Sequence, residues 1–472
     1  MLRKKTVIVG SGVSALMLAR MIRTYKTPET EIIIVEREAK VGGQFGSVDY
    51  GQHGYFDYGM HIYYECGIRE IDELFTSLLP ESEWNILTHN LKDVAGIYFN
   101  GKLQTNTPYP DLRSWPEEKW KTLVGSLFQH IKTFKKDTPV PDANAYQILT
   151  QHFGRDVTDE VFVPILQKLY LNHPSNLDEI ATKLTAINRV ALFDEATMLD
   201  LMKADAIRAR VCYPNQFTLP AYRTIDQRGF YPKSYGMVKV LDRFKATLEN
   251  ENVTFLTSAS ITSLAIEHNH INAINFNGAN GLSVINDIDK VYWTAGLPPL
   301  ALALKLDLSG MKNDKREPAF YVNFLFDKMP AMERLYYFYC FDADFRTFRV
   351  TNYTNYCPQA TDGRGFPLGV EVWPQTGDSI NEEDVINQTI NELKKFGVID
   401  EHFELQFAKV ERVHGGGFPL PTLNNIANMN VIRSLIEKKQ IYNLIPIGVL
   451  AEKNVFFIKD VMLDAFEKIK TK

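Results

Sequence analysis

Two glycines, a small residue and a carboxylate near the start of the chain have the spacing of a dinucleotide-binding site. Gly10 and Gly12 follow a short apolar run, Ala15 comes three residues later, and Glu36 ends the next apolar run. The first glycine permits a tight turn, the second lets a pyrophosphate approach the backbone, and the small residue allows close packing of helix and strand. Glu36 can accept hydrogen bonds from a ribose. The pattern predicts a dinucleotide site.

Two buried strands and the helix between them must position these residues. Residues 7–9 and 32–35 are continuous apolar runs, typical of buried parallel strands, and apolar side chains recur at helical spacing from Val13 to Met21. The N-terminus of such a helix offers unpaired amide groups and the positive end of its dipole to phosphates. We therefore expect Val13 and Ser14, at the start of the helix, to contact the ligand.

Two further glycine-containing stretches follow. Gly42 and Gly43 precede Gln44, and a glycine pair lets a backbone pass close to a bulky group, although a plain loop is the alternative. Gly59-Met60-His61 lies among aromatic residues. This segment is either a glycine-bent strand or a backbone that lies against a flat cofactor ring. His61 is accordingly either a group that orients the ring or a structural histidine.

An anionic ligand would need a local basic site, because the 472-residue chain has a net charge of −5. Arg349 is a candidate, since it lies between Phe348 and Val350 in a predicted strand over residues 344–353. Alternation predicts Phe348 and Val350 on one face and Arg349 on the other, with Thr347 and Thr351. That polar face lines either a ligand cleft or the solvent.

Composition excludes several classes of protein. The net charge gives no general attraction to nucleic acid, and no apolar run is long enough to span a bilayer. The first strand begins close to Met1, which leaves no room for a secretory signal. The four cysteines are scattered, so we expect free thiols in a reducing cytoplasm and no metal site. His268 and His270 occupy a predicted hairpin tip and are expected to be solvated.

Several motifs together resemble the UDP-galactopyranose mutase branch of the FAD-dependent amine oxidase and protoporphyrinogen oxidase superfamily. The match is to motifs spread over almost the whole chain. It comprises the glycine and acid fingerprint, Gly59 to Ile62, a hairpin and Tyr-Pro loop over 96–110, the strand over 345–356, and Gly417 to Thr422.

The resemblance implies an α/β fold. A Rossmann-like FAD-binding domain of the GR2 type would comprise residues 1–65, 225–300 and 411–472. A mixed α+β substrate-side domain, inserted into it, would comprise residues 66–224 and 301–410, with a helical block and an antiparallel sheet.

The same resemblance assigns roles to individual residues. His61, Arg189 and Arg349 would be catalytic, and the two arginines would clamp a diphosphate, which suits paired guanidinium groups. The residues implied to bind FAD are Gly10, Gly12, Val13, Ser14, Ala15, Glu36, Arg37, Gly43, Gln44, Gly59, Met60, His61, Ile261, Gly448, Asp460, Val461 and Met462. Asp460 is also the expected N-cap of the last helix.

The implied function is that of an FAD-dependent enzyme that acts on a small molecule, with a nucleotide-diphosphate sugar of cell-surface glycan biosynthesis favoured. Its chemistry at flavin N5 would be oxidoreductase or mutase-like. An amine oxidase or protoporphyrinogen oxidase-like oxidoreductase with a non-sugar substrate is one alternative, and a non-catalytic FAD-binding protein is another. Nucleic-acid partners and a membrane span are not expected, and a homo-oligomer is left open.

Overall fold

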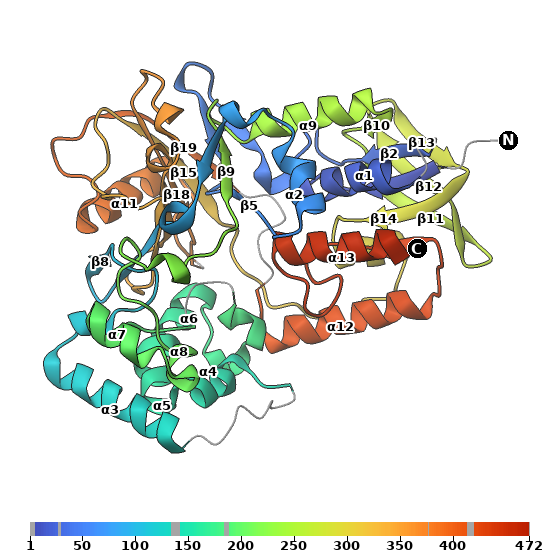
Figure 1. Ribbon diagram of the computed structural model, residues 1–472. Coiled ribbons are helices and arrows are strands. Elements are labelled where there is room, and N and C mark those ends of the chain that lie inside the picture. The colour runs from blue at the N-terminus through green and yellow to red at the C-terminus, as the bar shows by residue number, and fades with distance from the viewer. Residues whose placement is uncertain are drawn as a thin grey trace.

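A five-stranded parallel sheet carries the amino-terminal glycine turn (Figure 1). The computed structural model describes residues 5–26, 30–133, 142–183, 188–375, 377–412 and 420–471. The strand order is β10-β2-β1-β14-β20, and the strands are β1 (Lys5–Val9), β2 (Glu31–Val35), β10 (Val253–Leu256), β14 (Ile288–Trp293) and β20 (Leu444–Pro446). All neighbouring pairs are parallel, so the carboxyl ends of the strands share one edge.

Alternate residues of these strands supply two separate cores. Ile8, Ile32 and Ile34 pack under α1 (Val13–Tyr25), which contacts α2 (Arg69–Thr76), α9 (Val238–Asn250) and α13 (Ile458–Thr471). Val7 and Ile33 face the other side, where the covering elements are α10 (Leu297–Ala303), α12 (Leu423–Lys438) and the antiparallel sheet of β11 (Ser260–Glu267), β12 (His270–Gly278) and β13 (Gly281–Asn286). The period of two explains why both runs are continuously apolar.

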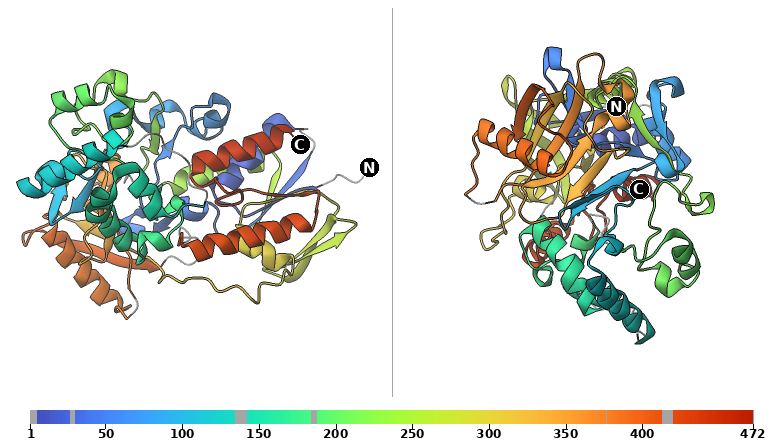
Figure 2. Two further views of the ribbon diagram at one scale, coloured as in Figure 1. Left: turned by 90° about the horizontal axis from the view of Figure 1, so that it is seen from below. Right: turned by 90° about the vertical axis from the view of Figure 1, so that its left-hand side faces the viewer.

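A seven-stranded mixed sheet forms the second part of the molecule, at the opposite end from the chain termini (Figure 2). Its order is β19-β15-β18-β17-β16-β7-β8, with strands β7 (Ala95–Phe99), β8 (Lys102–Gln104), β15 (Phe320–Phe326), β16 (Tyr337–Cys340), β17 (Thr347–Asn352), β18 (Phe366–Val372) and β19 (Leu405–Arg412). Helix α11 (Glu382–Lys395) packs against β15 and β19. The predicted hairpin is confirmed, since Asn100 and Gly101 both have positive φ between β7 and β8.

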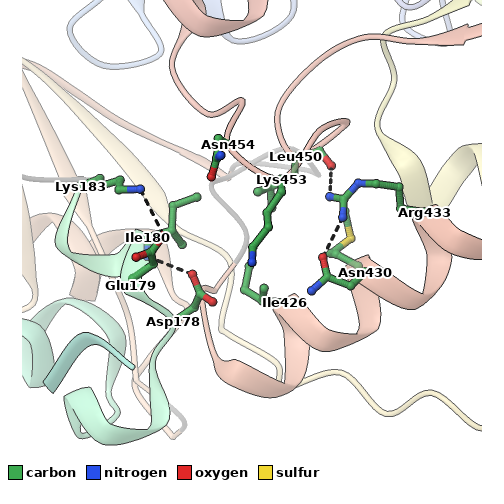
Figure 3. A pocket seen from close by; sticks show the side chains of 11 residues that line it. Asp178, Glu179, Ile180, Lys183, Ile426, Asn430, Arg433, Leu450, Lys453 and Asn454 are labelled. Carbon is green, nitrogen blue, oxygen red and sulfur yellow. Dashed lines mark hydrogen bonds and ion pairs between the residues drawn. The ribbon is translucent and has the colours of Figure 1, made fainter. Parts of the chain in front are cut away.

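The predicted helical block is confirmed and has its own core. It contains α3 (Glu117–Thr133), α4 (Ala145–Phe153), α5 (Arg155–Val157), a π-helix (Thr158–Phe162), α6 (Val163–Tyr170), α7 (Glu195–Leu201) and α8 (Asp205–Arg208). Figure 3 shows where the block meets α12: Ile180 packs near Leu450, whose carbonyl accepts a hydrogen bond from Arg433 at 2.8 Å. No helix among the described residues is long and apolar enough to cross a membrane.

Short strands connect the two sheets. β9 (Gly229–Pro232) pairs with β5 (Tyr63–Tyr64) and β6 (Trp84–Leu87), and β3 (Ser47–Asp49) pairs with β4 (Tyr55–Asp57). The buried Asp57 carboxylate accepts hydrogen bonds from Ser47, Tyr231 and the Met237 amide. This carboxylate therefore ties β4, β9 and the start of α9 together. The domain boundaries stay a prediction.

The prediction that Phe348 and Val350 lie on the same face of their strand is wrong. The register of β17 against β18 shifts between Thr347 and Arg349, which marks a β-bulge. As a result Phe348 packs in the core of the helical block, whereas Val350 packs in the core beneath the other face of the sheet. Simple alternation fails here because the bulge inserts an extra residue.

Candidate functional site

The glycine turn after β1 forms an open cradle at the start of α1. Gly10 has φ +98°, and a Cβ there would lie 2.5 Å from Oγ1 of Thr294, so only glycine fits. Gly12 is the N-cap of α1, and a Cβ there would meet nothing within 4 Å. Val13 and Ser14 begin the helix, where amide groups have no acceptor one turn earlier. Ala15 is fully buried against the sheet.

Glu36 lies at the carboxyl end of β2, directly beside this turn. Its Oε2 accepts hydrogen bonds from the backbone and hydroxyl of Ser11 at 2.8 and 2.6 Å, and its Oε1 accepts one from the Glu38 amide at 2.8 Å. These contacts fix the carboxylate next to the cradle. Arg37 points away and pairs with Glu38 on the surface at 3.0 Å.

The glycine pair crosses the cradle. The Gly42 amide donates to the Ser11 carbonyl at 2.9 Å, and a Cβ on Gly43 would lie 3.4 Å from the Cα of Gly12. A Cβ on Gly42 would collide with Leu241 of α9. The glycine pair therefore lets two backbone segments approach closely, and the exposed Gln44 follows directly. The predicted approach to a bulky group stays a prediction.

The third side of the cradle comes from the end of the chain. Gly448 has φ +133°, and a Cβ there would lie 3.6 Å from the carbonyl of Thr294, the same residue that a Cβ on Gly10 would meet. Val461 and Met462 are buried in the first turns of α13. The predicted N-cap is wrong, because α13 begins at Ile458 and Asp460 is its third residue. The Asp460 carboxylate instead reaches back to the amide of Phe457 at 2.9 Å.

The segment that precedes Ile261 lies beside the end of β2, close to Glu36. The Ala259 amide donates to the Glu36 carbonyl at 2.8 Å, and the Ser258 amide donates to the Glu38 carbonyl at 3.0 Å. Ile261, at the start of β11, packs partly buried against the core that contains Val35. Several predicted cofactor residues thus converge on one edge of the parallel sheet, namely Gly10, Gly12, Glu36, Gly43 and Gly448.

A second cluster forms around Gly59, where the Gly59–His61 segment lies against the seven-stranded sheet. A Cβ on Gly59 would lie 2.7 Å from Oε1 of Glu371 and 2.9 Å from Nη2 of Arg349. The His61 ring stacks on Phe45, with ring centroids 4.7 Å apart, and its Nε2 lies 2.6 Å from the Tyr58 carbonyl. Phe45 follows the glycine pair closely, so the two clusters adjoin.

The charges of this second cluster are strongly coupled. Burial, and then the Arg349 guanidinium, lower the pKa of His61 to about 4, so the ring is neutral at pH 7. Burial opposes the charge of Arg349, but contact with Glu371 raises the pKa of the guanidinium above its ordinary value. Burial raises the pKa of Glu371, while Arg349 opposes that shift.

Arg349 lies in a row of polar side chains across the sheet. Its neighbours in register are Tyr339 on β16 and Glu371 on β18, followed by Tyr321 on β15. The guanidinium carbon lies 5.8 Å from the ring centroids of both Tyr337 and Tyr339. The two possibilities left open for the Arg349 face are thereby resolved: the side chain is 14% exposed and faces the Gly59 segment rather than solvent.

Arg189 lies in the helical block, above Tyr109. Its guanidinium carbon is 6.0 Å from the Tyr109 ring centroid, and its buried Nε has no hydrogen-bond partner among the described residues. Burial raises the pKa of Tyr109, Arg189 opposes that shift, and Asp93 adds to it. Asp93 also lies within electrostatic range of Arg349. Asp93 is thus within electrostatic range of both Tyr109 and Arg349, and no contact between Arg189 and Arg349 is seen among the described residues.

Glu371 was not among the predicted site residues, although its position in the sequence is unusual. It is the single acid in the otherwise apolar strand Phe366–Val372. Residues 417–419 of the motif at Gly417 lie outside the described residues, and its last residue, Thr422, is the N-cap of α12. No group of metal-ligating side chains occurs within the described ranges, and all four cysteines are buried free thiols. Burial raises the pKa of Cys212 to about 12, which makes that thiol a poor nucleophile.

Comparison with known proteins agrees with this geometry. Residues 8–78 match the family of NAD(P)-binding Rossmann-like domains. The structure is similar to that of a reduced UDP-galactopyranose mutase, with 16% sequence identity, a TM-score of 0.73, and coverage of 99% of this chain and 95% of the other. The chain has the fold of UDP-galactopyranose mutase. This finding confirms the predicted α/β fold and, at the level of fold, the resemblance inferred from the motifs.

Two other solved structures are also similar to this chain. A putative protoporphyrinogen oxidase from Exiguobacterium sp. 255-15 is 15% identical, with a TM-score of 0.67 and coverage of 100% of this chain and 99% of the other. A CLA-producing fatty acid isomerase from P. acnes is 13% identical, with a TM-score of 0.58 and coverage of 99% and 98%. No curated protein matches the sequence.

The residues at the sheet edge fit a dinucleotide. The space in front of Gly12 is open, the first amides of α1 point out of the helix end, and the Glu36 carboxylate is held beside them. Among the described residues, a Cβ on Gly43 would meet only backbone atoms of Gly12 within 4 Å. The donor set of backbone amides with one carboxylate suits a pyrophosphate next to a ribose.

Proposed function

We propose that this chain is an FAD-dependent enzyme with a nucleotide-diphosphate sugar as its substrate. The observation that carries the proposal is the contact of the Gly59–His61 segment with Arg349 and Glu371, directly beyond the glycine cradle. A pyrophosphate at Gly12 would direct the rest of the cofactor along Gly43 and Phe45 toward His61. Bound FAD would supply a redox-active N5 at the junction of the two sheets.

The protein side of this chemistry is positioning and electrostatics. Arg189 offers an unpartnered Nε–H and Arg349 a guanidinium held rigidly by Glu371, and both suit the oxygens of a diphosphate. Neutral His61, with its Nε2 hydrogen-bonded to the Tyr58 carbonyl, would present a fixed edge to the cofactor and adds no charge. Tyr337 and Tyr339 would keep water from the guanidinium.

The decisive experiment combines flavin analysis with thermal shift. The purified protein is expected to be yellow, or to become so with added FAD, and UDP or UDP-galactose is expected to raise its Tm. Arg349→Ala and Arg189→Ala should each abolish the shift with UDP while they retain flavin. A colourless protein that does not take up FAD contradicts the cofactor. A flavoprotein that no nucleotide stabilises contradicts the substrate alone.

One observation favours a second candidate, an oxidoreductase that acts on a non-sugar substrate. The carboxylate of Glu371 already compensates the charge of Arg349, so this wall is close to neutral. A mutase-like enzyme is expected to turn over UDP-galactose only after the flavin is reduced with dithionite. An oxidoreductase should instead bleach the oxidised flavin when its substrate is added without oxygen.

A further inference from the structure

A hollow of about 330 Å³ lies at the edge of the helical block, away from the parallel sheet. Its walls come from the loop that leads into α3 and from the segment that leads into α7. This volume falls within the usual range of small-molecule pockets. None of the predicted cofactor or substrate residues lines it.

Aromatic side chains form most of the wall. Trp120 is oriented by a hydrogen bond from its indole Nε1 to the Leu192 carbonyl at 3.0 Å, and its ring meets Phe193 edge to face at 5.7 Å. Trp115 is 7% exposed, and its Nε1 has no acceptor among the described residues. The hollow therefore offers flat apolar surfaces, whereas the Trp115 indole nitrogen is itself buried.

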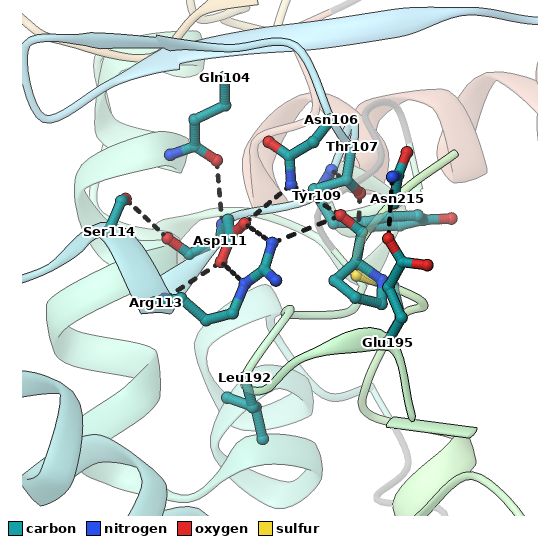
Figure 4. A network of polar contacts seen from close by, with 12 residues as sticks. Gln104, Asn106, Thr107, Tyr109, Asp111, Arg113, Ser114, Leu192, Glu195 and Asn215 are labelled. Carbon is teal, nitrogen blue, oxygen red and sulfur yellow. Dashed lines mark hydrogen bonds and ion pairs between the residues drawn. The ribbon is translucent and has the colours of Figure 1, made fainter. Parts of the chain in front are cut away.

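The charged residues at the rim cancel one another. Arg113 forms a two-pronged ion pair with Asp111 at 2.8 and 2.5 Å, as Figure 4 shows. Lys119, which lies 4.7 Å from the Trp115 ring centroid, pairs with Glu160 at 2.7 Å.

The two acids of the rim are engaged as well. Glu117 pairs with Lys121 at 2.7 Å, and the Asp194 carboxylate accepts hydrogen bonds from the amides of Ala196 and Thr197 at the start of α7. The ligand is thus offered hydrogen-bond donors and acceptors. Among the described residues, the Asp194 carboxylate is held by amide and hydroxyl donors and no ion pair is seen for it.

We propose that this hollow is a binding site for a neutral saccharide. A pyranose ring has an apolar C–H face, which can stack on Trp120 and Phe193, and hydroxyl groups at its rim, which can both donate and accept. The carboxylates of Glu117 and Asp194 are acceptors for those hydroxyls, and Arg113 is a donor. A cationic ligand fits less well, because Lys119 already occupies one face of Trp115.

The hollow is connected to Arg189 through the backbone. Residues 109–113 and 189–193 run side by side and parallel, with a bridge between Asp111 and Ala191 and a hydrogen bond from the Ala191 amide to the Pro110 carbonyl at 2.9 Å. One end of this pair of segments carries Arg189, and the other end carries Phe193. At an extended rise of about 3.3 Å per residue, the two ends lie about 13 Å apart. The hollow and Arg189 therefore lie at opposite ends of the same pair of segments.

Saturation-transfer NMR on the full chain tests the proposal, with methyl β-galactopyranoside and lactose as probes and choline as the cationic comparison. The saccharides are expected to give signals, and Trp120→Ala should weaken their binding at least tenfold. Tyr442→Ala is the matched control, because Tyr442 is an exposed aromatic residue on the parallel-sheet domain. Arg189→Ala should leave saccharide binding unchanged, which separates this site from the proposed substrate site.

Three results would overturn the proposal: no saccharide signal, signals that persist in Trp120→Ala, or signals from choline alone. If Trp120→Ala fails to fold, the Asp194→Asn variant is used to test saccharide binding instead. Asparagine keeps the helix cap but removes the charge, so the variant should fold and bind the saccharides several-fold more weakly. Unchanged binding in that folded variant contradicts the proposal.

Discussion

Arg349 and Glu371 form a buried ion pair across neighbouring strands, in which Nε and Nη2 of the arginine both lie 2.5 Å from Oε1 of the glutamate. The pair faces the Gly59 segment, and the arginine is also flanked by Tyr337 and Tyr339. This arrangement fixes the guanidinium in one position and reduces its net charge. The proposed use of Arg349 as an anion-binding group therefore depends on the state of Glu371.

Glu371→Gln tests that dependence. Loss of the carboxylate charge leaves Arg349 buried and uncompensated, so we expect the free energy of unfolding to fall by roughly 3 kcal/mol. The same change should increase the Tm shift produced by UDP, because a phosphate would then supply the missing charge. Chemical denaturation and thermal shift measure the two effects. A smaller shift with UDP in the variant would contradict the role of Arg349 in anion binding.

Gly12→Ala separates cofactor binding from stability. The added methyl group meets no protein atom within 4 Å and the backbone φ is ordinary, so the free energy of unfolding of the apoprotein should change by less than about 0.5 kcal/mol. The methyl group would nevertheless occupy the space proposed for the pyrophosphate, and flavin content should fall at least tenfold. Gly125→Ala, which also meets nothing within 4 Å, is the control. Full flavin content in Gly12→Ala would argue against the cradle.

Gly59→Ala should damage the second cluster. Its Cβ would lie within 3 Å of both Glu371 and Arg349, at a φ of +86°. We expect a loss of roughly 1–3 kcal/mol in stability together with loss of flavin. Gly51→Ala provides the comparison, because Gly51 also has a positive φ but open surroundings. Equal effects of the two substitutions on Tm and on the flavin spectrum would show that backbone strain alone is responsible.

Asp57 is expected to make stability depend on pH. Burial raises its pKa to about 6 in spite of the hydrogen bonds from Ser47, Tyr231 and the Met237 amide. Because the folded state binds this proton more tightly than the unfolded state, the stabilisation is complete below about pH 4 and is lost as the pH rises through 6. In the unsubstituted protein, the free energy of unfolding should therefore decrease by roughly 1–3 kcal/mol between pH 4 and 7. In Asp57→Asn this decrease should be absent. Denaturant titrations of both proteins at several pH values measure the difference.

His61 should stay neutral throughout the physiological range. Its pKa of about 4 lies below the ordinary value of 6.5, so the stabilisation from the neutral ring is present above pH 6.5 and is lost as the pH falls toward 4. NMR titration of its ring protons is expected to show no change between pH 5.5 and 8. A midpoint near 6.5 for His61 would contradict its burial against Arg349.

The sequence by itself determined the elements whose evidence is contiguous. The apolar runs before Gly10 and Glu36, the glycine spacing and the helical period from Val13 specify a strand–turn–helix–strand unit, because each depends on residues a few positions apart. The glycine turn of the cradle follows from that local pattern, whereas its crossing by Gly43 is a contact between distant segments. These residues lie together as the motif requires.

Only the tertiary structure decided the surroundings of Arg349 and Asp460. The bulge before Arg349 arises from pairing with a strand about twenty residues away, so no local period reveals it. Glu371 becomes its partner through cross-strand register, and Gly59 reaches the pair through packing between the two sheets. Asp460 lies inside α13 because the helix starts earlier than its first acid indicates. Register and packing between distant segments leave no periodic signal in the chain.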